Sequence, residues 1–397
     1  MSALRHPIYC TRTLSLEAVR PSIYTVLPHS WLHDILVKFP GLRELRMSEF
    51  PFFDAVSLLA VKAMRRPHVE LLHLSVPSSY NSTATGLCDL LDNLPRLQAL
   101  DLSNCSGAGN ILVLKCIPPT VRTLTLRDLD LTDANWKTVA IRVGLGIRSL
   151  DVRGNSLTDA AVQVMLDCSF APPGYLASSS EAVVEAGLTH LRIADNNITV
   201  SGAIKFIKTS RLVTLDLGTP ASGSGDILDL VPALSVYGHH ALRTIRLSHG
   251  IVTNTKGLRR RMLPRLKTLV LCGVPEWMGK QQVEALVQFI ATTKVMEEDC
   301  LETLELEMVT PDEAEDGGGV LDGEFSFFDG DQEGGSSWAG ARASGGERVE
   351  TLKEVKRVRG AKMGWQGRIR VVRDLGGRET QETGVEGERW GLVREGY

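Results

Sequence analysis

The chain lacks most of the features that mark membrane, secreted and metal-binding proteins. No apolar run is long enough to cross a membrane, and residues 1–13 lack the apolar core of a signal peptide. Seven cysteines are scattered without a C-x-x-C pair, which argues against a disulfide scaffold and against structural zinc. We therefore expect no membrane association and a cytoplasmic or nuclear location.

The chain also lacks the motifs of common catalytic sites. There is no G-x-S-x-G, no H-E-x-x-H, and no G-x-G-x-x-G after a strand. Residues 273–280 are similar to a phosphate-binding loop, but five residues separate the glycines and Gln281 replaces the magnesium-binding Ser or Thr. His249 and Cys272 fall near each other without a third ligand or an orienting acid. We expect no catalytic residue, no cofactor, no metal and no enzyme activity.

What the chain does have is a repeat. The frame Leu-x-x-Leu-x-Leu, with other aliphatic residues allowed, recurs ten times, and its L-x-L part places two side chains on one face of a short strand. The ten frames are Leu42/Leu45/Met47, Val69/Leu72/Leu74, Leu97/Leu100/Leu102, Val121/Leu124/Leu126, Ile147/Leu150/Val152, Leu188/Leu191/Ile193, Leu212/Leu215/Leu217, Leu242/Ile245/Leu247, Leu266/Leu269/Leu271 and Leu301/Leu304/Leu306.

Helix signals follow several of these strands. Thr, Asp or Ser residues stand where an N-cap is needed, because their side-chain oxygens accept the free amides of a first helical turn. These signals predict helices over residues 133–143, 159–167 and 201–208. The apolar pattern predicts further helices over 54–64, 86–94, 225–234 and 280–294.

A strand, a turn and a helix within about 27 residues resemble the ribonuclease-inhibitor-like class of leucine-rich-repeat proteins. The resemblance implies an α/β fold: a curved solenoid with a parallel inner sheet and outer helices. This class places Asn or Cys three residues after the last strand leucine, and Cys105, Asn155 and Asn196 match. Leu129 and Pro220 are among the residues that do not, so we expect irregular turns in the second half.

The composition divides the chain into four parts. Residues 1–41 are predicted to be an N-terminal cap with a degenerate repeat, and residues 42–310 the leucine-rich-repeat solenoid. Residues 311–347 are an acidic linker rich in Gly and Ser, and residues 348–397 are a basic tail. No clear apolar core accompanies the tail, so we expect it to be disordered.

The outward strand positions between and beside the paired leucines form columns across the predicted sheet. Their charges are mixed in the middle repeats, which favours a folded protein partner and argues against nucleic acid. Mixed charge also permits pairing between adjacent strands, and this alternative stays open. If these columns bind a partner, Arg153→Glu with Arg192→Glu should abolish partner capture and leave the melting temperature nearly unchanged. The predicted partner-binding residues are Asp101, Arg127, Asp151, Arg153, His190, Arg192, Asp216 and Arg246.

A repeat array of this kind builds a binding surface, so we predict a non-enzymatic scaffold that binds a protein partner on its concave face. Two narrower functions are alternatives. One is a substrate receptor of a ubiquitin ligase, although no convincing F-box helices precede the repeats. The other is a small-GTPase regulator resembling Ran GTPase activators, although their asparagine ladder is more regular. The sequence predicts neither the partner's identity nor the oligomeric state.

Overall fold

The computed structural model describes residues 11–16, 27–64, 66–170, 187–221, 225–238, 241–254, 256–291, 301–309, 348–360, 368–373 and 381–382. The acidic linker 311–347 lies outside these residues. The chain forms two compact units, residues 1–246 and 247–397, and the division falls within strand β9 (Thr244–Ser248). No helix among the described residues has the length and apolarity needed to cross a membrane.

Unit 1 is built on short parallel strands that follow one another in chain order. The register places the second leucine of each frame directly opposite the same leucine of the next frame, from Leu14 and Leu45 onward. The frame therefore sets the pairing, because a shift of one residue would turn every apolar side chain to the other face. The strands are β1 (Thr13–Ser15), β2 (Glu44–Arg46), β3 (His73–Ser75), β4 (Ala99–Asp101), β5 (Thr123–Thr125), β6 (Ser149–Asp151), β7 (His190–Arg192) and β8 (Thr214–Gly218).

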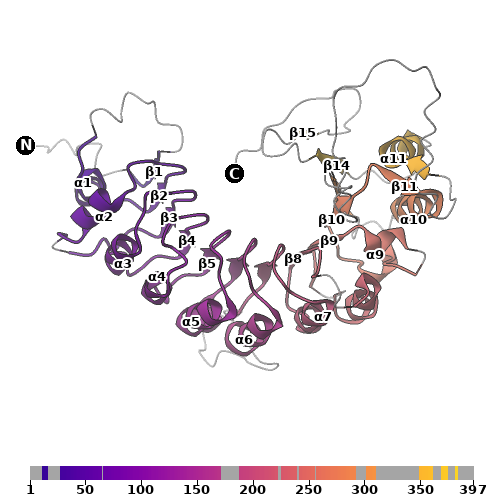
Figure 1. Ribbon diagram of the computed structural model, residues 1–397, viewed down its shortest axis with the longest axis horizontal. Helices are drawn as coiled ribbons and strands as arrows, with labels where there is room; N and C mark the ends of the chain where they lie inside the picture. The colour runs from indigo at the N-terminus through magenta and orange to yellow at the C-terminus, as the bar shows by residue number, and fades with distance from the viewer. Residues whose placement is uncertain are drawn as a thin grey trace, which may run out of the picture. The chain divides into compact units, whose positions relative to one another are not determined.

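Helices line the outer side of unit 1 and the strands line its inner side, as the predicted curved solenoid requires (Figure 1). The predicted helices are present, except that residues 225–234 are divided between the short segments η4 and α8. Helix α4 was not predicted, and neither were α9 (Gly250–Thr253) and α11 (Thr351–Gly360) of unit 2. The segments are α1 (Trp31–Lys38), α2 (Ala55–Val61), α3 (Ala84–Asp92), α4 (Ile111–Cys116), α5 (Asp133–Val143), η3 (Gly144–Gly146), α6 (Asp159–Ser169), α7 (Val200–Lys208), η4 (Ile227–Asp229), α8 (Leu230–Ala233) and η5 (Leu234–Gly238).

One repeat frame read from the sequence is wrong by two residues. Val69 is 45% exposed, whereas Leu71 and Val76 are fully buried and Leu74 lies opposite Leu45. The frame is Leu71/Leu74/Val76, since the run Val-Glu-Leu-Leu-His-Leu-Ser-Val satisfies the pattern in two overlapping registers. The corrected middle column of unit 1 is Arg46, Ser75, Asp101, Thr125, Asp151, Arg192 and Asp216.

A buried asparagine joins the turns of two neighbouring repeats. Asn155 Oδ1 accepts hydrogen bonds from the amides of Leu129 (3.2 Å) and Leu131 (2.9 Å). Its Nδ2 donates to the carbonyls of Leu126 (2.8 Å) and Val152 (2.9 Å). One side chain thus satisfies backbone groups that the turns leave without partners.

Other residues at the same position of their repeats also bind backbone groups of the turns in unit 1. Asn196 binds the Leu157 amide at 3.0 Å, and the Cys105 thiol donates to the Val76 carbonyl at 2.8 Å. In the corrected second frame, Leu71/Leu74/Val76, the equivalent residue is Ser79, whose buried hydroxyl also donates to the Val76 carbonyl. The predicted matches at Cys105 and Asn196 are therefore confirmed.

A second set of contacts joins the helices on the outer side. Asp133, in the first turn of α5, accepts from the amide and hydroxyl of Thr158, the N-cap of α6, at 2.8 and 2.7 Å. Asp159 makes the same two contacts with Thr199, the N-cap of α7, at 2.9 and 2.5 Å. Gly202 leaves room for this contact, because a Cβ there would lie 2.3 Å from Asp159 Oδ1. The two Thr-Asp pairs thus join α5 to α6 and α6 to α7.

Unit 2 contains three parallel strands, β10, β12 and β14, paired in that order, with β15 antiparallel to β14 and β11 antiparallel to β13. Thr268 of β10 lies opposite Thr303 of β12, so the frames at 266 and 301 are also in register. Its elements are α9 (Gly250–Thr253), η6 (Arg260–Met262), β10 (Thr268–Val274), β11 (Trp277–Gly279), α10 (Lys280–Ala291), β12 (Thr303–Met308), β13 (Arg348–Glu350), α11 (Thr351–Gly360), β14 (Arg368–Arg373) and β15 (Gln381–Glu382).

The tail was predicted to be disordered, and the structure describes three parts of it, residues 348–360, 368–373 and 381–382, as regular elements. β14 extends the sheet of unit 2, and Ile369 and Val371 are 3% and 5% exposed. Composition did not predict this order, because the partner of β14 is β12, a strand about 65 residues earlier, and local sequence carries little information about such distant pairing.

Candidate protein-binding surface

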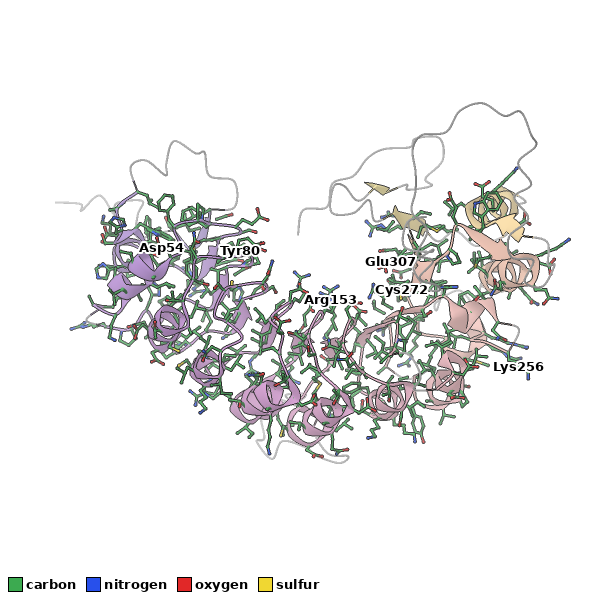
Figure 2. The ribbon with its side chains drawn as sticks, viewed as in Figure 1. Asp54, Tyr80, Arg153, Lys256, Cys272 and Glu307 are labelled. Carbon is green, nitrogen blue, oxygen red and sulfur yellow. The ribbon has the colours of Figure 1, made fainter. Side chains whose placement is uncertain are left out.

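The predicted partner-binding residues lie at the strands and strand ends on the inner side of unit 1. Figure 2 shows Arg153 on this concave side. The structure brings five of the eight together in one network of alternating charge. These five, named here the arginine–aspartate network, are Asp151, Arg153, Arg192, Asp216 and Arg246.

The central contact is a two-pronged ion pair between Arg153 and Asp151. Arg153 Nε and Nη2 donate to the two carboxylate oxygens at 3.0 and 2.9 Å. The pair lies two residues apart, at the end of β6 and the start of its turn, so both side chains project from the same face. The flat guanidinium fits two carboxylate oxygens at once, which fixes its orientation.

The network continues on both sides of this pair. Arg192 Nη1 lies 3.7 Å from Asp151 Oδ2, and Arg153 Nη1 lies 3.7 Å from Asp216 Oδ2. Arg246 Nη1 then donates to Asp216 Oδ1 at 3.0 Å. Strands β6, β7 and β8 are therefore joined by charge as well as by their backbone ladder, and the pairing between adjacent strands that the sequence left open is present.

The two aspartates of the network are buried, whereas Arg192 is exposed to solvent. The side chains of Asp151 and Asp216 are only 8% exposed, whereas that of Arg192 is 52% exposed. Buried carboxylates need their partners, because an unpaired buried charge costs about 3–5 kcal/mol. Arg153→Glu would place a third carboxylate beside these two, so we now expect Arg153→Glu with Arg192→Glu to lower the melting temperature.

Small side chains make the network possible. Gly218 has a φ of +57°, and a Cβ there would lie 2.8 Å from Ala194 Cβ and 3.2 Å from Arg246 Nη1. Without a side chain at 218, Arg246 can reach across to Asp216. Ala194 and Gly218 occupy outward positions just after the last aliphatic residues of their frames, Ile193 and Leu217, and their small size is a sequence signal for this site that the prediction of binding residues did not include.

The charge states follow from these contacts. Burial lowers the pKa of Arg153, but the hydrogen bonds and charge of Asp151 outweigh this effect, and the net result is a raised pKa. Partial burial lowers the pKa of His190, and the neighbouring Arg192 lowers it further. His190 is therefore largely neutral near pH 7, and the positive charge of this surface comes from arginine.

Asp101 and Arg127 lie outside the network. Asp101 Oδ1 accepts from the amide and hydroxyl of Ser103, at 3.0 and 2.7 Å. Arg127 Nε donates weakly to the same hydroxyl at 3.5 Å. Arg127 is half-buried, with its guanidinium held by one long neutral contact. Ser103 connects these two predicted residues, and the sequence did not single it out.

The His249 and Cys272 pair and the loop-like segment 273–280 make ordinary backbone and side-chain contacts. His249 Nδ1 lies 3.4 Å from the backbone carbonyl of Cys272, and burial lowers the pKa of His249. Residues 273–280 form the end of β10, then β11 and the first residue of α10, and Gly279 donates its amide to Gln282. Within the described residues, no three His, Cys, Asp or Glu side chains gather as a metal site.

Comparison with known proteins points to the repeat. The family model described as "Leucine Rich repeat" matches residues 188–206, which hold β7 and most of α7. Among solved structures, the chain is similar to the yeast Rad7 and Elc1 complex at 17% identity and a TM-score of 0.45, over 74% of this chain and 69% of that one. It is also similar to the leucine-rich-repeat protein LegL7 of Legionella pneumophila at 15% identity and a TM-score of 0.29, over 70% and 80% of the two chains. No curated protein sequence matches the chain.

Proposed function

We propose that this chain, a leucine-rich-repeat protein of the ribonuclease-inhibitor-like class, is a non-enzymatic scaffold that binds a protein partner on the concave face of unit 1. The observation that carries the proposal is Arg192. Its side chain is 52% exposed, and its ion pair with Asp151 is a single 3.7 Å contact. Most of its hydrogen-bonding capacity therefore faces the concave side.

The rest of the network holds this surface rigid. Arg153 is fixed by two short hydrogen bonds, and Arg246 by one. A partner that binds such a surface loses less side-chain entropy on the scaffold, because the arginines are already ordered. Arginine is also among the residues that contribute most to binding energy when they lie at the centre of an interface.

The charge balance indicates the partner's chemistry. Three arginines stand over two buried carboxylates, so the network has one positive charge in excess at neutral pH. A partner carboxylate placed between Arg192 and Arg127 would neutralise that excess. The surrounding strand positions Thr123, Ser149 and Thr214 are small and polar, which suits a mixed polar and apolar protein surface rather than a polyanion.

Affinity capture tests the proposal. The bait is the tagged full-length chain, compared with an Arg127→Ala/Arg192→Ala variant and with a Lys137→Ala/Lys205→Ala control on the outer helices α5 and α7. Quantitative mass spectrometry should identify a protein that the wild type and the control retain and the concave variant loses by about tenfold or more. Equal retention by all three baits would contradict the concave-face proposal.

The captured protein also separates the narrower functions. Cullin-type ligase subunits would indicate a substrate receptor of a ubiquitin ligase. A small GTPase would indicate a regulator of that class. Neither function has a specific observation in its favour, so the scaffold is the conclusion proposed for this chain.

A further inference from the structure

Charge in unit 1 is separated between the two rims of its sheet. All strands run in the same direction, so the connections that lead from helix to strand lie along one rim and those from strand to helix along the other. We name the rim with the helix-to-strand connections the basic rim, and the rim with the strand-to-helix connections the acidic rim. The described part of the basic rim has one anion, Glu70, against the cations Arg43, Lys62, Arg66, Arg96, Arg122, Arg148, Arg211 and Arg243.

The acidic rim has the opposite balance. Its only described cations are Arg127 and Arg153, which belong to the concave surface. Its described anions are Glu49, Asp54, Asp128, Asp130, Asp195 and Asp226. The net charge of the whole chain, -3, conceals this separation.

Four arginine side chains of the basic rim have no partner among the described residues. Arg66, Arg96, Arg122 and Arg243 are exposed, and none of their guanidinium groups forms an ion pair or hydrogen bond with another described residue. They lie four to six residues beyond the last residue of the preceding helical segment. A helix dipole stabilises cations only near the last turn of the helix, so it contributes little to the stability of arginines at this distance.

An apolar pocket opens on the same rim. It has a volume of about 710 Å³ and is formed by the end of α1 with its connection to β2 and by the connection from α2 to β3. Val37 and Val69 line it and are 54% and 45% exposed, Pro40 and Met64 complete an apolar wall, and Arg66 borders it. Apolar surface of this kind inside a concavity is typical of a site for a partner's side chain.

We propose that the basic rim of unit 1 binds an acidic polypeptide segment, with one apolar side chain of that segment in the pocket. Arg96 and Arg122 precede β4 and β5, and the pocket lies beside β2 and β3. Neighbouring strands are about 4.8 Å apart, so this stretch of rim spans roughly 10–15 Å. An extended peptide covers that length with about four residues.

The rim favours a peptide over nucleic acid. Single-stranded nucleic acid is usually held by bases stacked on exposed aromatic side chains. The aromatic residues among the described basic-rim positions are Phe39, His68 and Phe170, and none of them is exposed. An apolar pocket beside unpaired arginines fits glutamate or aspartate residues around a leucine.

Fluorescence anisotropy with the full-length chain tests this site. The probe is a fluorescein-labelled peptide of four Glu-Glu-Leu repeats, and its comparison peptide has Ser in place of Leu. Arg96→Glu/Arg122→Glu and Val37→Asp/Val69→Asp should each weaken probe binding by about tenfold or more. The matched controls Lys137→Glu/Lys205→Glu and Ile141→Asp should change binding by less than about twofold.

The comparison peptide, the salt dependence and duplex DNA distinguish the proposed site from other modes of binding. The Ser peptide should bind more weakly, and raising the salt from ~50 to ~300 mM should weaken both peptides. Binding that is insensitive to the rim and pocket variants, or reduced equally by the controls, would overturn the proposal. Tighter binding of duplex DNA that Arg96→Glu/Arg122→Glu abolishes would also overturn it in favour of nucleic acid. Where charge reversal lowers the melting temperature, Arg96→Ala/Arg122→Ala provides the same comparison.

This site is independent of the concave one. Arg127→Ala/Arg192→Ala should leave peptide binding unchanged, because both residues lie outside the basic rim. Loss of peptide binding in that variant would show that the probe occupies the concave surface instead, and the assignment to the rim would be rejected.

Discussion

Removal of the Asp151 carboxylate should destabilise unit 1 more than any single change at an exposed acid. Asp151→Ala removes both hydrogen bonds to the Arg153 guanidinium, at 3.0 and 2.9 Å, and the 3.7 Å contact with Arg192. Breaking a buried pair costs about 3–5 kcal/mol when the remaining charge has no partner. Arg153 keeps Asp216 at 3.7 Å and is 28% exposed, so we expect a loss of roughly 2–3 kcal/mol.

The assay is thermal unfolding of the full-length chain followed by circular dichroism. For a unit of this size, each kcal/mol shifts the melting temperature by about 2–4 °C, so Asp151→Ala should lower it by roughly 4–12 °C. Hydrogen exchange should become faster in β6, β7 and β8, where the network joins the strands, and should change little in β2 and β3.

Asp92→Ala is the matched control. Asp92 is exposed at the end of α3, and its loss should change stability by less than about 0.5 kcal/mol. A double-mutant cycle with Arg153→Ala should show positive coupling, because the double variant no longer leaves the Arg153 guanidinium without its main carboxylate partner, and the remaining Arg192 is 52% exposed to solvent. An effect of Asp151→Ala no larger than that of Asp92→Ala would refute the view that this carboxylate is a buried support of the surface.

Three further changes test the contacts between repeats. Gly202→Ala should lower the melting temperature, although alanine usually stabilises a helix by about 1 kcal/mol, because its Cβ would lie 2.3 Å from Asp159 Oδ1; a higher melting temperature would contradict the contact. Asn155→Ala should cost about 3 kcal/mol in denaturant unfolding, since it leaves buried backbone groups of two turns unpaired, and a loss under 1 kcal/mol would be the contrary result. Burial raises the pKa of the Cys105 thiol to about 11, so the unfolded chain loses this proton first and stability should fall between about pH 9 and 11. Cys105→Ala should make that fall shallower; an unchanged pH profile would argue against the buried thiol.

The sequence was sufficient to predict the repeat because each frame is specified by several apolar residues at fixed spacing. The exception is the second frame, which was placed two residues too early. Leu71 and Leu72 are adjacent, so two registers satisfy the same pattern, and only burial separates them: Leu71 is fully buried, whereas Val69 is 45% exposed. A local pattern cannot decide between registers that differ by two residues, because both place leucine on the same face of the strand.

The candidate surface was predicted in part. The outward columns identified the residues of the network but not which of them are buried. Their burial depends on contacts with neighbouring strands that lie 24 to 41 residues away in the chain. The separation of charge between the rims was not predicted either. It appears only when the connections are assigned to two rims, and arginines as distant as Arg66 and Arg243 then lie along the same one.

Arg192 on the concave face is proposed to contact a protein partner, and isothermal titration calorimetry with the captured partner tests this contact most directly. Arg192 is half-exposed and its ion pair is long, so Arg192→Ala should change stability by less than about 1 kcal/mol. At the centre of an interface, loss of an arginine costs about 2 kcal/mol or more, which is a Kd increase of about 30-fold. We therefore predict a Kd at least about 30-fold higher with nearly the same melting temperature. A Kd within about twofold of the wild-type value would contradict the concave-face account.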